Sequence, residues 1–248
     1  MTKFLVLGNW KSNGRITDLD PFAETFHKLS GTFPEDMVSG IALPFHMIHS
    51  AGSLSPHWLG AQNVSAHSEG AYTGEITSGM LSEIHTRFCL VGHSERRQYF
   101  NETVQDTHAK LHRLLKAGIY PVFCIGETLK QRQEGMLEPV LREQLSPVLK
   151  LDGGAFAIAY EPVWAIGTGV AATPADVAQA HGMIRGMLSG TPIEQTPILY
   201  GGSVKPENAR DLATIDEVAG FLVGGASLKA DHFAAITDGF LRGKQLRS

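Results

Sequence analysis

The sequence has little cysteine and little charge. It contains only Cys89 and Cys124, with no C-x-x-C spacing, which excludes a disulfide-rich scaffold and predicts reduced thiols. Charged residues make up 19% of the chain, the formal net charge is −4, and no run of Lys or Arg exceeds two residues. Because nucleic-acid binders present a basic face, we expect no nucleic-acid partner.

Long hydrophobic runs are missing as well. The apolar run at residues 4–7 is too short for a signal peptide or a membrane span, so we expect a cytoplasmic protein with no membrane partner. Apolar residues still reach 43%, enough to bury a core and to exclude a disordered chain. No Gly/Ser/Pro-rich linker divides the sequence, which predicts a single domain over residues 1–248.

What the chain does contain is a series of eight short apolar runs, most of them soon followed by Gly or Pro and then by an amphipathic stretch. The runs are Phe4–Leu7, Val38–Leu43, Trp58–Ala61, Phe88–Val91, Ile119–Ile125, Phe156–Tyr160, Ile198–Tyr200 and Phe221–Val223. Eight runs in 248 residues leave about 31 residues for each, the size of one strand–helix unit. Continuous apolar strands indicate a parallel sheet covered on both faces. The pattern predicts an α/β fold and supports a closed (β/α)8 barrel, although an open doubly wound sheet would alternate in the same way.

The segments between the runs are predicted to be helical. Asn101 can cap a helix that has Asp106 near its start and ends at Gly118. A second helix is predicted over Pro174–Ser189, with proline in its first turn, and a third over Ser227–Phe240.

Polar residues follow the first and fourth runs, where either architecture would gather function at the carboxyl ends of the strands. Lys11 could meet an anion or polarise an oxygen, or be a solvated surface lysine. His93 could act as an acid, a base or a metal ligand, or only cap a helix. A helix that starts at Ser94 would place its positive end beside His93, which predicts a lowered pKa and a neutral imidazole.

A carboxylate and an apolar loop follow the sixth run. Glu161 is held between a strand and Pro162, well placed for proton abstraction, and an apolar cover would raise its pKa. The cover is predicted to be Val163–Ile166, apolar residues that lead into Gly167-Thr168-Gly169. A lid that closes over a substrate would explain such a loop, and so would a loop packed permanently on the body.

Glycine pairs follow the last two runs. Gly201-Gly202-Ser203 and Gly224-Gly225 would let backbone N–H groups approach an anion, and the second pair opens a helix. Glycine turns at these two positions predict a phosphate site, although either pair alone could be a plain turn.

Other candidate motifs are weaker. His108 and His112 share a helix face, but the Glu of a metalloprotease H-E-x-x-H is absent, so we expect a solvated face. Cys124 is expected to pack rather than react, and Glu127 to cap a helix or orient its neighbours. Residues 167–172 match G-x-G-x-x-A and leave open a dinucleotide-binding oxidoreductase, and the glycine turns leave open a non-catalytic phosphate-binding barrel.

Together these motifs resemble those of the triosephosphate isomerases, in order and over nearly the whole chain. The matching segments are Asn9–Lys11, His93–Arg96, Tyr160–Gly169, Tyr200–Val204 and Leu222–Leu228. The resemblance implies a single-domain (β/α)8 TIM barrel, a homodimer that interconverts dihydroxyacetone phosphate and D-glyceraldehyde 3-phosphate through an enediol(ate), in glycolysis and gluconeogenesis, without metal or cofactor.

The resemblance also assigns roles. It makes Glu161 the base, His93 the neutral electrophile and Lys11 the cation that binds substrate, with Glu95 positioning Lys11. Asn9 helps to orient the site. The backbone phosphate contacts map to Gly167, Ser203, Gly224 and Gly225. The polar stretch of residues 62–81 resembles the loop that inserts into the partner subunit, with Thr73 near the partner's site.

Overall fold

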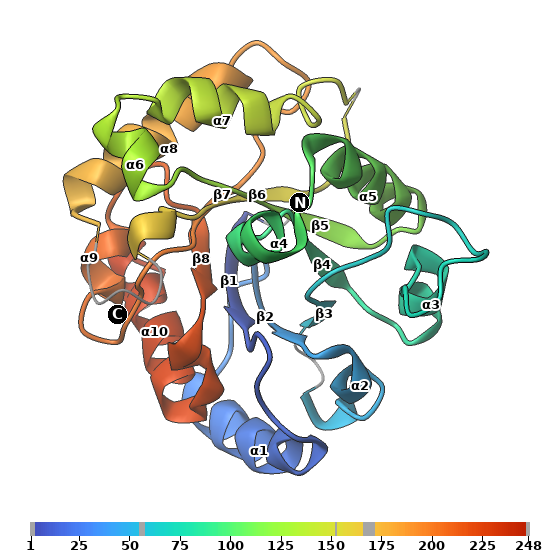
Figure 1. Ribbon diagram of the computed structural model, residues 1–248. Coiled ribbons are helices and arrows are strands. Elements are labelled where there is room, and N and C mark those ends of the chain that lie inside the picture. Colours follow the sequence, from blue (N-terminus) through green and yellow to red (C-terminus); the bar gives the residue numbers. More distant parts are fainter. Residues whose placement is uncertain (1–2, 55–57, 152, 166–171, 247–248) are drawn as a thin grey trace.

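The computed structural model describes residues 3–54, 58–151, 153–165 and 172–246 (Figure 1). Gly167, Thr168 and Gly169 of the predicted lid therefore lie outside the described residues. No helix within the described ranges is long and apolar enough to cross a membrane.

The strands form one closed, parallel barrel. They are β1 (Phe4–Asn9), β2 (Met37–Leu43), β3 (Trp58–Ala61), β4 (Phe88–Val91), β5 (Tyr120–Ile125), β6 (Ala157–Tyr160), β7 (Ile198–Tyr200) and β8 (Gly220–Val223). Each pairs with its neighbour in sequence, and β8 closes the barrel on β1 with Leu5 opposite Gly220. Figure 1 shows the strands at the centre and helices around them. All eight predicted runs are strands, and closure excludes the open doubly wound sheet.

Helices return the chain between successive strands. The α-helices are α1 (Leu19–Ser30), α2 (Phe45–Ile48), α3 (Ser78–Glu83), α4 (Ser94–Phe100), α5 (Val104–Lys116), α6 (Leu129–Gln133), α7 (Leu137–Leu145), α8 (Pro174–Leu188), α9 (Ala209–Ala213) and α10 (Ala230–Gly243). Short 3-10 turns are η1 (Ile16–Asp18), η2 (Gly52–Leu54), η3 (Val163–Ala165) and η4 (Gly225–Leu228).

Two of the predicted helix starts were wrong. Asn101 does not cap α5: it ends α4 in the left-handed conformation, with φ of 53°. Thr103 caps α5 instead, because its hydroxyl accepts from the Asp106 N–H and the Asp106 carboxylate accepts from the Thr103 N–H. The third helix was predicted to start at Ser227, but Ser227 lies in the 3-10 turn η4, and α10 starts only at Ala230.

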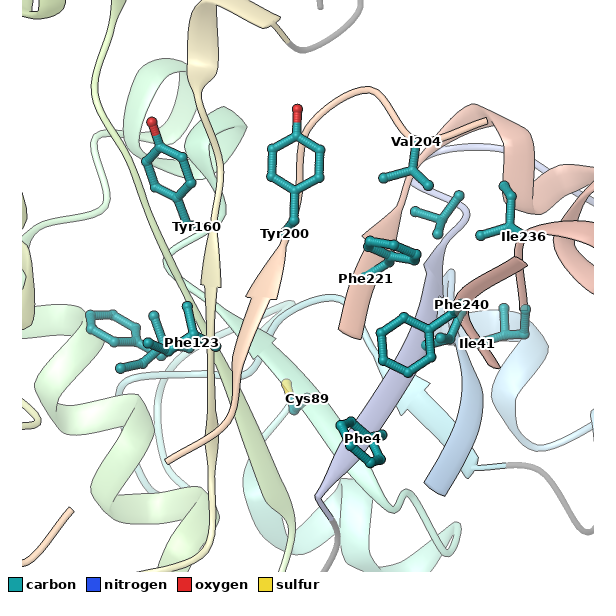
Figure 2. Close-up of a cluster of buried hydrophobic side chains, with 14 of the residues drawn as sticks. Phe4, Ile41, Cys89, Phe123, Tyr160, Tyr200, Val204, Phe221, Ile236 and Phe240 are labelled. Atoms are coloured by element: carbon teal, nitrogen blue, oxygen red, sulfur yellow. The ribbon is translucent and has the colours of Figure 1, made fainter. Parts of the chain in front are cut away.

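The alternation of side chains along the strands produces two core layers. Inward-facing residues fill the barrel, among them Leu5, Leu7, Phe88 and Leu90. Outward-facing residues pack under the helices, and Figure 2 shows the rings of Phe4 from β1 and Phe221 from β8 beside the ring of Phe240 from α10. Burial on both faces is the physical reason for the continuous apolar runs in the sequence.

Candidate active site

A cavity of about 300 Å³ opens at the carboxyl ends of the strands. It brings together residues from five strand ends, and the predicted site residues among its lining are Asn9, Lys11, His93, Glu161, Ser203, Gly224 and Gly225. Glu95 joins the group through Lys11, whereas Gly167 lies outside the described residues. Asn9 and Gly224 are 215 positions apart in the sequence but line the same cavity, because the carboxyl ends of all the parallel strands lie at one rim of the barrel.

Lys11 is held in a strained conformation. Its φ of 51° lies in the left-handed region, which is uncommon for a residue with a side chain and is typical of functional sites. The Asn9 side chain accepts from the Lys11 N–H at 3.0 Å, and the Gln62 amide donates to the Lys11 carbonyl at 2.8 Å. The Lys11 ammonium lies 2.7 Å from Glu95 Oε1, so backbone and side chain are both positioned.

His93 stands at the start of α4 and uses both ring nitrogens. Its Nδ1 accepts from the Glu95 N–H at 3.2 Å, and its Nε2 lies 3.0 Å from Glu161 Oε1. An imidazolium has protons on both nitrogens and could not accept at Nδ1. The contacts therefore fit a neutral ring with its proton on Nε2, directed at Glu161.

The space around Glu161 is created by two glycines. A Cβ on Gly126 would lie 1.8 Å from the Glu161 carbonyl oxygen, and one on Gly201 would lie 2.9 Å from Glu161 Cγ. A side chain at position 201 would therefore collide with the carboxylate side chain. The sequence predicted Gly201 only as part of a phosphate-binding turn and did not reveal this packing requirement. Glu161 itself is only 2% exposed, and its Oε2 accepts from the Ser94 N–H at 3.0 Å.

These contacts determine the direction of the pKa shift of both groups. For Glu161, burial raises the pKa, but His93, the Ser94 N–H and Lys11 together outweigh burial and lower it. For His93, burial lowers the pKa, but the Glu161 charge and hydrogen bond outweigh burial and raise it. Burial thus raises the Glu161 pKa, as predicted for a covered carboxylate, but the sequence did not reveal the contacts that outweigh it. The predicted lowering of the His93 pKa was wrong, because it did not include the direct contact with Glu161.

One end of the predicted lid is anchored on a buried carboxylate. Glu127, fully buried, accepts from the Trp164 indole at 2.9 Å and from the Tyr160 hydroxyl at 3.1 Å. Arg132 lies 3.3 Å from Glu127 and over the Trp164 ring, and it also pairs with Asp176 in the first turn of α8. Glu127 therefore orients its neighbours, the second of its two predicted roles.

Two hydrogen bonds hold the glycine turn after β8 in place. The Ser227 hydroxyl donates to the Gly224 carbonyl at 2.7 Å, and the Trp10 indole donates to the Ser227 carbonyl at 3.0 Å. After β7, the turn packs against the Tyr200 hydroxyl, since a Cβ on Gly202 would lie 2.2 Å from that oxygen. Figure 2 shows the Tyr160 and Tyr200 hydroxyls directed toward the same end of the barrel.

The weaker candidates do not join this cavity. His108 and His112 lie on the exposed face of α5, as expected. Cys124 is fully buried, and burial raises the pKa of its thiol, so it packs rather than reacts. Within the described ranges, no group of three or more His, Cys, Asp and Glu side chains could hold a metal ion.

Sequence reasoning missed several positioning groups. The Gln62 amide bonds Lys11, the Trp10 indole bonds the turn after β8, and the Ser94 N–H bonds Glu161. No sequence pattern identified these hydrogen bonds. A larger cavity of about 500 Å³ lies on the other side of Glu161, lined by Arg97 and Leu129 among others. Its lining does not include Lys11, His93 or the glycine turns, which line the smaller cavity.

The fold and the site define a barrel enzyme for proton transfer on a small anionic substrate. A carboxylate, an imidazole and an ammonium face one cavity, whose other end is made of glycine turns. These features suit acid–base chemistry on a carbonyl compound that has a phosphate group.

Comparison with known proteins identifies the family. The model of the triosephosphate isomerase family matches residues 4–240. A triosephosphate isomerase of Azoarcus is 43% identical over 244 residues, covering 95% of this chain and 98% of its own. Others from Xanthomonas oryzae and Ralstonia nicotianae are 44% and 43% identical, covering 95% and 94% of this chain and 97% and 96% of their own.

The chain belongs to the triosephosphate isomerase family. It is an isomerase that interconverts dihydroxyacetone phosphate and D-glyceraldehyde 3-phosphate, the reaction of this family in glycolysis and gluconeogenesis. This finding replaces both the dinucleotide-binding and the non-catalytic alternatives.

Proposed function

We propose that Glu161, His93 and Lys11 perform the isomerisation as one unit. Glu161 removes a proton from one substrate carbon and returns it to the other. His93 donates from Nε2 to the substrate oxygens, and Lys11 stabilises the negative charge of the enediolate. The observation that supports this assignment is the convergence of all three side chains on one cavity of about 300 Å³.

The basicity of Glu161 depends on the contacts that it gives up. His93 and the Ser94 N–H stabilise its charged form, which makes it a weak base where it lies. When the carboxylate turns to a substrate carbon, it leaves these partners while its burial remains. Its pKa then rises toward that of a working base, and His93 is free to bond the substrate oxygen.

The phosphate group is proposed to bind at the glycine end of the cavity. Ser203, Gly224 and Gly225 line this end, and their backbone N–H groups would receive the phosphate together with Gly167. Asn9 supports the arrangement through the Lys11 backbone. Phosphate held away from the reacting carbons supplies binding energy that closes the lid, and a closed lid protects the enediolate from losing phosphate.

The protein is further proposed to be a cytoplasmic homodimer that assembles through residues 62–81. Exposed apolar side chains in this segment support the assignment, since Tyr72 is 45% and Met80 is 41% exposed. Sedimentation of the wild type should give a dimer, and Met80→Lys should weaken it. Leu29→Lys is the matched control, because Leu29 is 50% exposed at the opposite end of the barrel. A wild type that sediments as a monomer would contradict the proposal.

The residue assignments are tested together by a coupled assay run in both directions. Wild type should convert each triose phosphate into the other without added metal or cofactor. Variants Glu161→Gln, His93→Gln and Lys11→Ala should each lose most of this activity while they keep the circular-dichroism spectrum of the folded barrel. A folded variant with near-normal kcat would remove that residue from the proposed unit.

A further inference from the structure

A second lysine lines the active-site cavity. Lys205 follows the β7 glycine turn and lines the cavity together with Ser203, Gly224 and Gly225. Its side chain is exposed at the rim, and no carboxylate of the described residues forms an ion pair with its ammonium. The proposed chemistry gives Lys205 no role.

The charges around the cavity favour a role in capture. A phosphate monoester is close to a dianion at neutral pH. The chain has a formal net charge of −4, and one of its carboxylates, Glu161, lies in the cavity wall. The Lys11 ammonium is paired with Glu95 at 2.7 Å, so much of its charge is compensated before substrate arrives. Lys205 is therefore the unpaired cation at the glycine end among the described residues.

The backbone of Lys205 is fixed relative to the proposed phosphate contacts. Its N–H donates to the Asn208 side chain at 2.8 Å, and the Asn208 amide donates to the Ser203 carbonyl at 3.0 Å. Asn208 thus ties Lys205 to Ser203, while the four-carbon side chain beyond Cα remains long enough to follow an approaching anion.

We propose that Lys205 is an electrostatic capture residue, which attracts the substrate phosphate and directs it to the glycine end of the cavity. The proposal rests on the proposed phosphate site. A rim charge acts on the encounter and on its salt dependence rather than on the bound reaction. Lys205 should therefore contribute to kcat/KM and much less to kcat.

The test compares Lys205→Ala, Lys205→Glu and Lys205→Arg with Lys28→Ala, which removes an exposed lysine near the far end of α1. At low ionic strength, kcat/KM for D-glyceraldehyde 3-phosphate should fall about threefold in Lys205→Ala, the scale of an exposed charge pair. It should fall further in Lys205→Glu and stay near wild type in Lys205→Arg and Lys28→Ala. The differences should shrink at about 0.5 M salt, because exposed charges are then screened.

Unphosphorylated D-glyceraldehyde and inorganic phosphate complete the test. Turnover of D-glyceraldehyde should be the same in all four variants, and competitive inhibition by phosphate should weaken in Lys205→Glu. Unchanged kcat/KM in Lys205→Glu would overturn the capture role, and so would an equal loss with both substrates. Failure of the proposed phosphate site would look different: inorganic phosphate would not inhibit even the wild type.

Discussion

The backbone N–H of Ser94 donates to Glu161 Oε2 at 3.0 Å, which joins the first residue of α4 to a carboxylate that follows β6. The other oxygen of the same carboxylate lies 3.0 Å from His93 Nε2. Both contacts stabilise the charged carboxylate, so the base is held ionised but weak. The exchange of these partners for substrate is the step on which the predictions for the site depend.

Glu161→Gln should abolish proton abstraction while it preserves shape. The amide can still accept from the Ser94 N–H, so the fold and the cavity should persist. We expect kcat to fall by at least about 10²- to 10⁴-fold, the usual contribution of a general base. Isothermal titration with a phosphate-bearing inhibitor should show binding within a few-fold of wild type. Loss of binding together with activity would indicate a structural role.

Lys11→Ala should affect binding and turnover together. The ammonium is expected to stabilise both the bound substrate and the enediolate, so KM should rise and kcat should fall by about 10²-fold or more. Steady-state kinetics in both directions would measure the two effects. Glu95→Gln is the comparison, because it keeps the lysine but weakens the 2.7 Å ion pair that holds it. Equal kinetics for Lys11→Ala and wild type would make the lysine a bystander.

Arg132→Ala should destabilise the contacts by which Glu127 holds Trp164. Without the guanidinium, Glu127 stays buried with the neutral Trp164 and Tyr160 donors. Asp176 in α8 loses its ion pair with α6 and keeps its hydrogen bonds to Thr173. The free energy of unfolding should fall by about 2 kcal/mol, as for a buried acceptor that loses a charged partner. Urea denaturation would measure it. Arg142→Ala removes an exposed i,i+4 pair and should cost far less.

The buried His181 should make stability depend on pH. Burial lowers its pKa from 6.5 to about 4, since its ring is fully enclosed. Among the described residues its Nδ1 is bonded to the Glu217 carbonyl at 3.1 Å, and its Nε2 has no hydrogen-bond partner. Between these pH values the unfolded chain binds a proton that the folded chain does not. Stability should therefore fall as pH drops from about 6.5 to about 4, by up to about 1.4 kcal/mol per pH unit, and level off below.

The control for this effect is His181→Phe, which keeps the ring beside Tyr160 but removes the titration. Its stability relative to wild type should improve steadily as pH falls through that window. His108→Phe removes an exposed histidine and should leave the slope unchanged. Parallel stability curves for His181→Phe and wild type would contradict the assignment.

Local rules accounted for much of the fold. Trp58–Ala61 and Phe88–Val91 were predicted as strands with the observed bounds, because burial on both faces requires uninterrupted apolar residues. Helix α8 was predicted within one residue, because Pro174 and Gly190 mark its ends. The prediction that Asn101 caps α5 failed because asparagine is common both at helix starts and at left-handed helix ends. The Thr103–Asp106 capping box decides between the two.

The sequence by itself determined the repeat of eight strands, the positions of polar residues at their carboxyl ends and, through its motifs, the resemblance that the comparisons confirmed. Only the tertiary structure decided that the barrel closes, that Gly201 makes room for Glu161, and that Lys205 at the glycine end has no carboxylate partner among the described residues. It also decided both pKa directions. A pKa depends on which charges meet within a few ångströms, and for His93 and Glu161 that meeting spans 68 positions of the chain, which no local pattern encodes.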